Sequence, residues 1–263
     1  MTADDPAIVS GDSASLEIRK IGFSDLRDAL AKGYDDFTAM PSHAVFLCII
    51  YPIIGVILLR FITGQSLLPM LFPVVAGYAL VGPFAAIGLY ELSRRRELGI
   101  DASPAHIFEV LWAPSIGAVA ALGVLLTLIF VFWLVAAQEI YRYAFNGVIP
   151  TSFDEFARLI FTTHAGWILV FLGNGVGFLF ALTAFSVGVV SFPLVLDRHV
   201  DAARAIVTSL RAVAANPVTM AAWGLIVAVA LALGSLPLFV GLIVVMPVLG
   251  HATWHLYRHV VVH

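Results

Sequence analysis

Charged residues are scarce in this sequence of 263 residues: Asp, Glu, Lys and Arg make up 12% of it, and hydrophobic residues make up 61%. A soluble domain carries roughly 25% charged residues, so about half of the usual solvating surface is missing. This scarcity excludes an ordinary soluble enzyme and a disordered regulator. The net charge of −3 gives no basic footprint for nucleic acid either. The composition therefore predicts an all-α polytopic protein, a bundle of transmembrane helices in a lipid bilayer.

Cysteine is nearly absent as well, since Cys48 is the single one. This excludes a disulfide scaffold and a zinc site built from several cysteines. Residues 1–18 contain neither the basic start nor the short apolar core of a signal peptide, so we expect an uncleaved, disordered polar tail. Nucleophile motifs, Gly-rich phosphate loops and paired carboxylates are also lacking. We therefore do not expect an enzyme.

Six apolar stretches are long enough to cross ~30 Å of hydrocarbon. They lie near residues 43–62, 67–90, 114–138, 165–195, 218–234 and 236–257. The fourth is longer than a straight crossing requires, so we expect it to tilt or to break at Pro193. The last two are separated only by a tight turn near residues 234–237. They form two crossings, which we favour, or one re-entrant hairpin.

Residues 19–41 predict an amphipathic helix that is too charged to cross a membrane. Ser24 is its expected N-cap and Pro41 its expected end. Apolar residues recur along it at helical spacing: Phe23, Leu26, Leu30, Tyr34 and Phe37. The helix is net acidic, so anionic lipid should repel it. We therefore expect Leu30 and Phe37 to pack on the protein's own cytoplasmic face or on a partner subunit.

Three further polar stretches predict interfacial helices, near residues 101–113, 152–164 and 197–215. The last of these has two stripes at helical spacing. One is polar, with Asp197, Asp201, Arg204, Thr208 and Arg211, and the other is apolar, with Val200, Ala203, Val207, Leu210 and Ala214. Such a helix lies on a membrane or on a neighbouring protein, and Arg204 and Arg211 are candidates for contact with anionic lipid.

The distribution of Lys and Arg predicts the orientation in the membrane. With the N-terminus inside, the cytoplasmic segments hold eleven of these residues and the outer segments hold three, Arg60, Arg142 and Arg158. An even number of crossings then puts both termini in the cytoplasm, and the expected location is the bacterial inner membrane. The run Arg94, Arg95 and Arg96 supports this orientation. We expect Glu91, three or four residues earlier, to pair with Arg94 or Arg95.

Two other groups of residues have both a structural and a functional interpretation. Gly173 and Gly177 lie on a small-residue face of the fourth stretch, which favours close helix packing or, alternatively, an unwound ligand site. His251, His255, His259 and His263 repeat every four residues along one helical stripe. His251 and His255 are candidate ligands for a metal, and haem or copper is the candidate cofactor. The alternative, which we favour, is that they are structural, because a single stripe supplies the imidazoles.

Several motifs resemble those of an uncharacterised bacterial family of predicted integral membrane proteins. They are Gly82-Pro83 with Gly88-Leu89-Tyr90-Glu91-Leu92-Ser93-Arg94-Arg95-Arg96-Glu97, Ser191-Phe192-Pro193 with Leu196-Asp197-Arg198, Asn216-Pro217, and Gly250-His251-Ala252-Thr253-Trp254-His255-Leu256-Tyr257-Arg258. The resemblance extends from Ile21 onward. It implies a domain of unknown function, some of whose relatives are labelled as subunits of cytochrome oxidase. The chain lacks the set of haem and copper histidines that a catalytic oxidase subunit needs.

Two functions are consistent with these observations. The first is a non-catalytic accessory or assembly protein of a larger membrane complex, plausibly a respiratory one. The second is a transporter of small solutes or metal ions, which the Pro- and Gly-rich second stretch and the Gly-rich fourth stretch favour. A dry bundle with a large apolar lateral face would favour the first, and an aqueous cavity lined by polar groups would favour the second.

Overall fold

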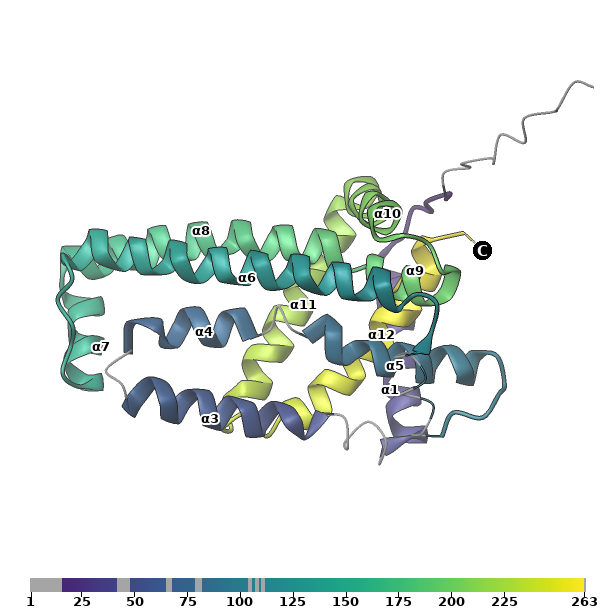
Figure 1. The fold of residues 1–263 in the computed structure, drawn as a ribbon, viewed down its shortest axis with the longest axis horizontal. Coiled ribbons are helices and arrows are strands. Elements are labelled where there is room, and N and C mark those ends of the chain that lie inside the picture. The colour runs from purple at the N-terminus through teal and green to yellow at the C-terminus, as the bar shows by residue number, and fades with distance from the viewer. Residues whose placement is uncertain are drawn as a thin grey trace, which may run out of the picture.

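The computed structural model describes residues 16–41, 48–64, 68–78, 82–103, 106, 109 and 112–262. Within these ranges the regular secondary structure is helical, apart from an isolated β-bridge between Ile18 and Val261. Two long helices, α6 (Ile116–Phe145) and α8 (His164–Gly188), lie side by side along the long axis (Figure 1). The predicted all-α fold is confirmed.

The remaining helices extend or close this pair. α3 (Ile50–Gly64), a short 3₁₀ helix η1 (Leu68–Met70), α4 (Leu71–Tyr78) and α5 (Gly82–Glu97) follow the same axis. At one end α7 (Phe153–Thr162) joins α6 to α8. At the other end lie α1 (Phe23–Ala39), α9 (Ser191–Arg198) and α10 (Ala202–Ala215). The last two helices, α11 (Pro217–Ser235) and α12 (Leu242–Val260), form a hairpin set obliquely to the others (Figure 1).

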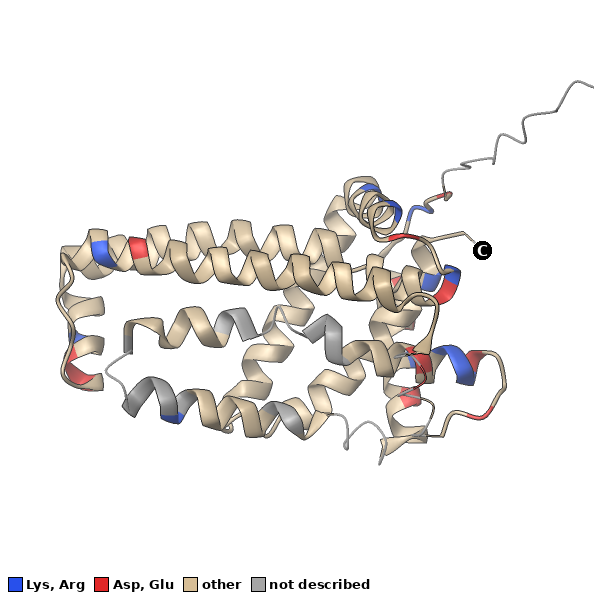
Figure 2. Ribbon diagram, viewed as in Figure 1, with Lys and Arg blue, Asp and Glu red and all other residues tan. Residues whose placement is uncertain are grey.

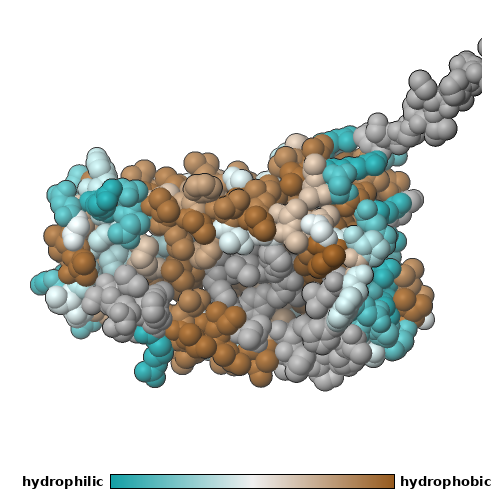
Figure 3. All heavy atoms as spheres, viewed as in Figure 1, coloured by the Kyte–Doolittle hydropathy of each residue, from teal (hydrophilic) through white to brown (hydrophobic). Residues whose placement is uncertain are grey.

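Charge and hydropathy divide the molecule along its long axis. Charged residues gather at the two ends of the ribbon (Figure 2), and the visible surface between them is mainly hydrophobic (Figure 3). Among the described residues, three segments are long and apolar enough to cross a membrane: Ile116–Phe145, His164–Arg198 and Pro217–Ser235. The bilayer therefore surrounds the middle of the bundle, and the two ends face water.

The fourth predicted crossing breaks, but earlier than expected. α8 ends at Gly188 and α9 begins at Ser191, so the break precedes Pro193. The hydroxyl of Ser209 explains the position, because it accepts from the Val190 amide (3.2 Å) and donates to the Ser186 carbonyl (2.7 Å). It thus satisfies backbone groups that the break exposes. Pro193 lies in the first turn of α9, where its missing N–H costs nothing.

Other boundaries also differ from the prediction. The stretch 67–90 is divided into η1, α4 and α5, and α5 continues to Glu97. The interfacial helix predicted from residue 197 starts only at Ala202, because Asp201 caps it by accepting from the Arg204 amide at 2.9 Å. Asp197 belongs to α9 instead. Of the helix predicted at 101–113, residues 104–105, 107–108 and 110–111 lie outside the described residues, as does the tail before residue 16.

α1 packs across α12 at the charged end of the bundle. Its N-cap is Gly22 rather than the predicted Ser24, because the Asp25 carboxylate accepts from the Gly22 amide at 2.7 Å. The buried face is also rotated from the predicted one: it consists of Leu26, Ala29, Gly33 and Asp36, whereas Phe23 and Tyr34 are 62% and 60% exposed. Small residues define this face because the two backbones approach closely.

The hairpin of α11 and α12 turns beside α3. A Cβ on Gly55 would lie 2.6 Å from the Phe239 ring, which belongs to the turn at residues 236–241. Gly55 is nine residues before the end of α3 at Gly64, so the turn stops about 13 Å short of that end at 1.5 Å per residue. Leu236 and Leu238 of the turn are 78% and 63% exposed. The turn is therefore apolar and exposed, and it lies beside the middle of α3 rather than beside its end.

The two chain ends are joined at the same end of the molecule. The Arg19 amide donates to the Val260 carbonyl at 2.8 Å, and the Val262 amide donates to the Glu17 carbonyl at 3.1 Å. Both terminal segments therefore lie at the same end of the bundle.

Candidate functional site

The buried carboxylate of Asp36 is the centre of a polar cluster where α1, α5 and α12 meet. The Ser93 hydroxyl donates to Asp36 Oδ2 at 2.6 Å, and His255 Nε2 lies 2.8 Å from the same oxygen. Arg96 pairs with Oδ1 of Asp36, and its other amino group lies 2.8 Å from Asp35. Asp36 is only 3% exposed. Side chains from two other helices thus replace the water that a carboxylate needs.

His251 extends this cluster into the core, where it is fully buried. Its Nδ1 lies 2.7 Å from Ser93 Oγ. The single Ser93 proton is committed to Asp36, because an ionised carboxylate only accepts, so His251 Nδ1 must donate to Ser93. This assigns the ring proton to Nδ1 and leaves Nε2 as an acceptor, for which the described part of the chain supplies no hydrogen-bond partner.

The cluster holds Asp36 in its ionised form. Burial raises the pKa of the Asp36 carboxyl, but hydrogen bonds from His255, Ser93 and Arg96 outweigh this and bring the pKa to about 2. A carboxylate with so low a pKa and three committed donors is a poor proton acceptor. The arrangement is therefore suited to holding three helices together rather than to acid–base catalysis.

A polar cleft of about 370 Å³ borders the cluster on the side of α1. Its lining residues are Lys32, Asp35, Asp36, Arg96, Glu97 and His255. Cationic and anionic groups alternate within it, and most of them are already paired with one another. The cleft therefore favours neither an anion nor a cation.

More polar contacts tie α12 to the helices around it. Trp254 Nε1 donates to Glu97 at 2.9 Å, and the Tyr257 hydroxyl donates to Asp197 at 2.6 Å. On α5, Glu91 is buried and forms the ion pairs that the spacing predicts, with Arg94 at 2.8 Å and Arg95 at 2.7 Å. The C-terminal ends of α5, α9 and α12 are thus cross-linked by side chains.

The predicted histidine stripe faces α1 and α5. His259 Nε2 lies 2.8 Å from Asp28, which precedes Asp36 by two turns of α1. This contact repeats the one between His255 and Asp36. His263 lies outside the described residues. No group of three or more His, Cys, Asp or Glu side chains in the described part of the chain is arranged to hold a metal ion. A metal on His251 and His255 therefore stays a prediction without a third protein ligand.

Asp36 and Ser93 were not among the predicted site residues. In the sequence, Asp36 looks like one of several solvated charges on an amphipathic helix. The sequence does contain an indication that Asp36 is buried. Ala29 and Gly33 lie seven and three residues before it, and small residues at this spacing mark the helix face that makes the closest contact. Leu30 and Phe37, which were predicted to anchor the helix, are part-buried at the edges of the core.

The predicted glycine face of α8 is divided in the structure. A Cβ on Gly177 would lie 3.0 Å from the Trp133 ring of α6, whereas nothing lies within 4 Å of one on Gly173. On α10, Arg204 and Arg211 are exposed, and so are Val207 and Leu210. The side of α10 that faces the bundle has small residues instead: Ala205, Thr208, Ser209 and Ala212.

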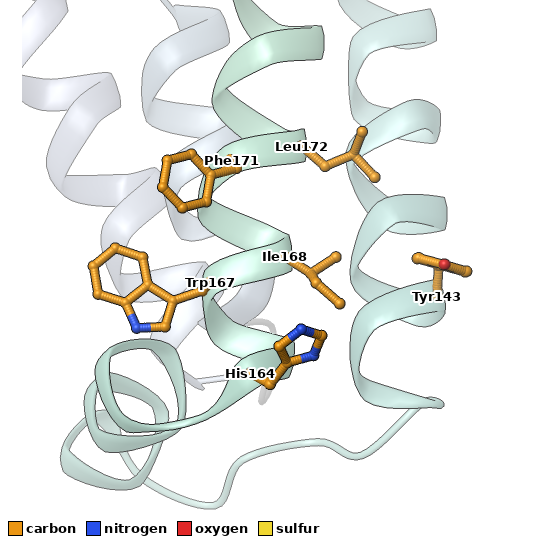
Figure 4. Close-up of a pocket in the computed structure, with 6 residues that line it drawn as sticks. All are labelled: Tyr143, His164, Trp167, Ile168, Phe171 and Leu172. Carbon is orange, nitrogen blue, oxygen red and sulfur yellow. The ribbon is translucent and has the colours of Figure 1, made fainter.

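A second hollow lies at the opposite end, between α6 and α8. This open groove of about 710 Å³ is lined by Tyr143, His164, Trp167, Ile168, Phe171 and Leu172. His164, Ile168 and Leu172 project toward α6, whereas Trp167 and Phe171 project from the other side of α8 (Figure 4). Exposed aromatic residues near the end of a crossing helix are typical of the membrane–water boundary.

The fold and its two charged ends define a polytopic helical membrane protein. Residues 71–197 match the model of a family described as Predicted integral membrane protein (DUF2189), whose function is unknown. The match confirms the resemblance drawn from the sequence motifs. It includes the motif at 82–97 and all but the last residue of the motif at 191–198, while the motifs at 216–217 and 250–258 lie beyond it. No curated protein and no solved structure matches the chain.

Proposed function

We propose that the protein is a non-catalytic accessory or assembly subunit of a larger membrane complex. The observation that carries the proposal is that the buried polar side chains bond to one another and so hold the helices together. At the charged end, the carboxylates of Asp36, Glu91 and Glu97 are committed to bonds between or along helices. Polar groups so committed stabilise one arrangement of the helices rather than a reaction or a path for a solute.

The lateral surface supports the same proposal. Large hydrophobic side chains of α6 and α8 are exposed along the length of the pair, among them Phe132 (62%), Phe171 (74%) and Phe178 (64%). Such a surface accommodates lipid or the helices of another membrane protein. Relatives labelled as subunits of cytochrome oxidase make a respiratory complex the first partner to examine.

The experiment compares membrane complexes with and without the protein. We expect it to migrate in native gels with a complex larger than itself, and the amount of that complex to fall when the gene is deleted. Migration only as free protein, with all membrane complexes unchanged in the deletion strain, would contradict the proposal. Uptake of a solute by proteoliposomes containing the pure protein would favour a transporter instead.

We propose a bacterial inner membrane location with both termini in the cytoplasm. The pairing of the terminal segments supports a common side, and the eleven-to-three distribution of Lys and Arg supports the cytoplasm. Reporter fusions after Gly99 and His263 should report cytoplasm, and fusions after Gly147 should report periplasm. The opposite result at any of these positions would contradict this topology.

Within this topology we propose that α11 and α12 form a re-entrant hairpin, in place of the two crossings that the sequence favoured. Only the ten residues Leu242–His251 of α12 precede the level where α1 packs on it at Ala252, and ten helical residues span about 15 Å, half of the hydrocarbon thickness of ~30 Å. In a Cys48→Ala background, an impermeant maleimide added outside should label Ile149→Cys but not Leu238→Cys. Equal labelling of the two cysteine variants would contradict the re-entrant hairpin and support two crossings.

A further inference from the structure

One polar side chain points out of the middle of a membrane-crossing helix. Asn174 of α8 is exposed, although its helix is one of the segments apolar enough to cross a bilayer. Its Nδ2 donates to the Val170 carbonyl at 2.7 Å. The second N–H and the carbonyl oxygen of this carboxamide have no partner in the described part of the chain. Hydrocarbon offers them none, so an exposed asparagine at this depth is unfavourable in an isolated copy.

Asn174 is flanked on the surface of α8 by a glycine and two exposed aromatic rings. A Cβ built on Gly175 would meet nothing within 4 Å. Phe171 and Phe178, about one turn to either side, are 74% and 64% exposed. Positions 171, 174, 175 and 178 share one face of the helix. This face therefore presents a polar group and a gap between two large rings, into which a second helix can approach closely.

We propose that this face of α8 is the interface through which two copies of the chain associate in the membrane. Copies inserted in the same direction are related by a two-fold axis along the membrane normal, which brings one face of α8 against itself. The free N–H of Asn174 then donates to the carboxamide oxygen of Asn174 of the partner subunit, and the reverse bond forms by symmetry.

The chemistry of Asn174 is what selects a second copy as the occupant. A carboxamide with one free donor and one free acceptor is complementary to itself, so the symmetric pair satisfies both groups on both sides. A lipid acyl chain offers neither a donor nor an acceptor. The interface is independent of the accessory function proposed above, because it requires only the chain itself.

The mass of the purified protein tests this interface. In lipid nanodiscs or under native mass spectrometry in mild detergent, we expect a dimer for the wild-type chain and a monomer for Asn174→Leu. The matched control is Thr183→Val, which removes a different exposed polar group, a hydroxyl, from α8. Thr183 lies nine residues, or two and a half turns, from Asn174. It should remain a dimer. A monomeric wild-type chain, or an Asn174→Leu variant that stays fully dimeric, would overturn the proposal.

Disulfide cross-linking in native membranes tests the same face without purification. In the Cys48→Ala background, mild oxidation should link Gly175→Cys into a covalent dimer. Val135→Cys, which lies on α6 near the same depth and is 55% exposed, should stay monomeric. Cross-linking at Val135→Cys alone, or at both positions equally, would show that this face of α8 is not the interface. Unchanged helix content of each variant by circular dichroism would exclude misfolding as the cause.

Discussion

The contact between α1 and α12 and the contact between α6 and α8 hold the molecule together by different means. The first is close and polar: Gly33 lies against the backbone of Ala252, and the buried carboxylate of Asp36 bridges the helices through His255. The second is apolar, with Trp133 of α6 packed against Gly177 and near Phe180 of α8. At the water-facing end, specific polar bonds define how the helices are arranged. Within the hydrocarbon region, the arrangement depends instead on complementary shape and on dispersion forces between the helices.

The largest expected effect is at the closest approach of α1 to α12. In Gly33→Ala the new Cβ would lie 2.5 Å from the Ala252 amide nitrogen, and backbone cannot rotate away from it. We expect a loss of about 3 kcal/mol in the free energy of unfolding. In the control Gly117→Ala on α6, nothing lies within 4 Å, so the change should be within about 1 kcal/mol, in the stabilising direction. Equal melting temperatures in detergent would show that the close contact is not essential.

Removing the charge at the centre of the polar cluster should have the next largest effect. The pKa of Asp36 falls from 3.8 to about 2 on folding, which corresponds to about 2 kcal/mol at 1.36 kcal/mol per pKa unit. We therefore expect Asp36→Asn to lose about 2 kcal/mol at neutral pH. The matched control is Asp35→Asn, whose side chain is 69% exposed and which should change stability little. Equal losses in both variants would contradict a special role for Asp36.

The same carboxylate predicts a dependence on pH. Because its pKa is lower in the folded state, its contribution is complete above about pH 4 and is lost as the pH falls toward 2. Unfolding of the wild-type chain by denaturant should therefore show a steeper loss of stability across this interval than unfolding of Asp36→Asn. Parallel curves for the two proteins would mean that Asp36 is not held ionised by its neighbours.

In the apolar region a single polar bond is worth testing. The indole N–H of Trp133 donates to the Pro73 carbonyl at 2.9 Å and so ties α6 to α4. We expect Trp133→Phe to cost about 1 kcal/mol, the usual net value of one hydrogen bond, plus a small packing loss. Phe132→Leu is the control, since Phe132 is 62% exposed and faces the membrane. A larger loss than for Asp36→Asn would reverse the contrast between the two regions.

Much of the architecture follows from the sequence, because bilayer thickness and the need to pair backbone groups leave few alternatives for long apolar stretches. α6, α7 and α11 lie where the pattern puts them, within a few residues at most ends. The depth of the last hairpin does not follow, since hydropathy alone cannot distinguish a crossing from a loop that returns. The contact of Phe239 with Gly55 is the observation on which the proposed re-entrant hairpin rests.

The polar cluster was harder to predict than the fold. The helical spacing of large apolar residues assigns Phe23 and Tyr34 to the apolar stripe of α1, but both are exposed. The buried face depends instead on Ala29 and Gly33, because their small size allows the backbone of α12 to approach α1 closely. Glu91 was found because its partners are three and four residues away. Asp36 was missed because its partners Ser93 and His255 come from distant helices.

The smallest effect should come from a charge pair that is near the cluster but remains in water. Lys32 lies 2.7 Å from Asp28, one turn earlier on α1, and the two side chains are 52% and 44% exposed. Water screens such a pair, so Lys32→Gln should change the free energy of unfolding by less than about 0.5 kcal/mol. Asp28 keeps its contact with His259 in this variant, so docking of α1 should persist. Raising the salt concentration should remove even this difference, because screening acts on exposed charges and spares buried ones. A loss above 1 kcal/mol would mean that many exposed charges, rather than the buried carboxylate of Asp36, hold α1 on α12.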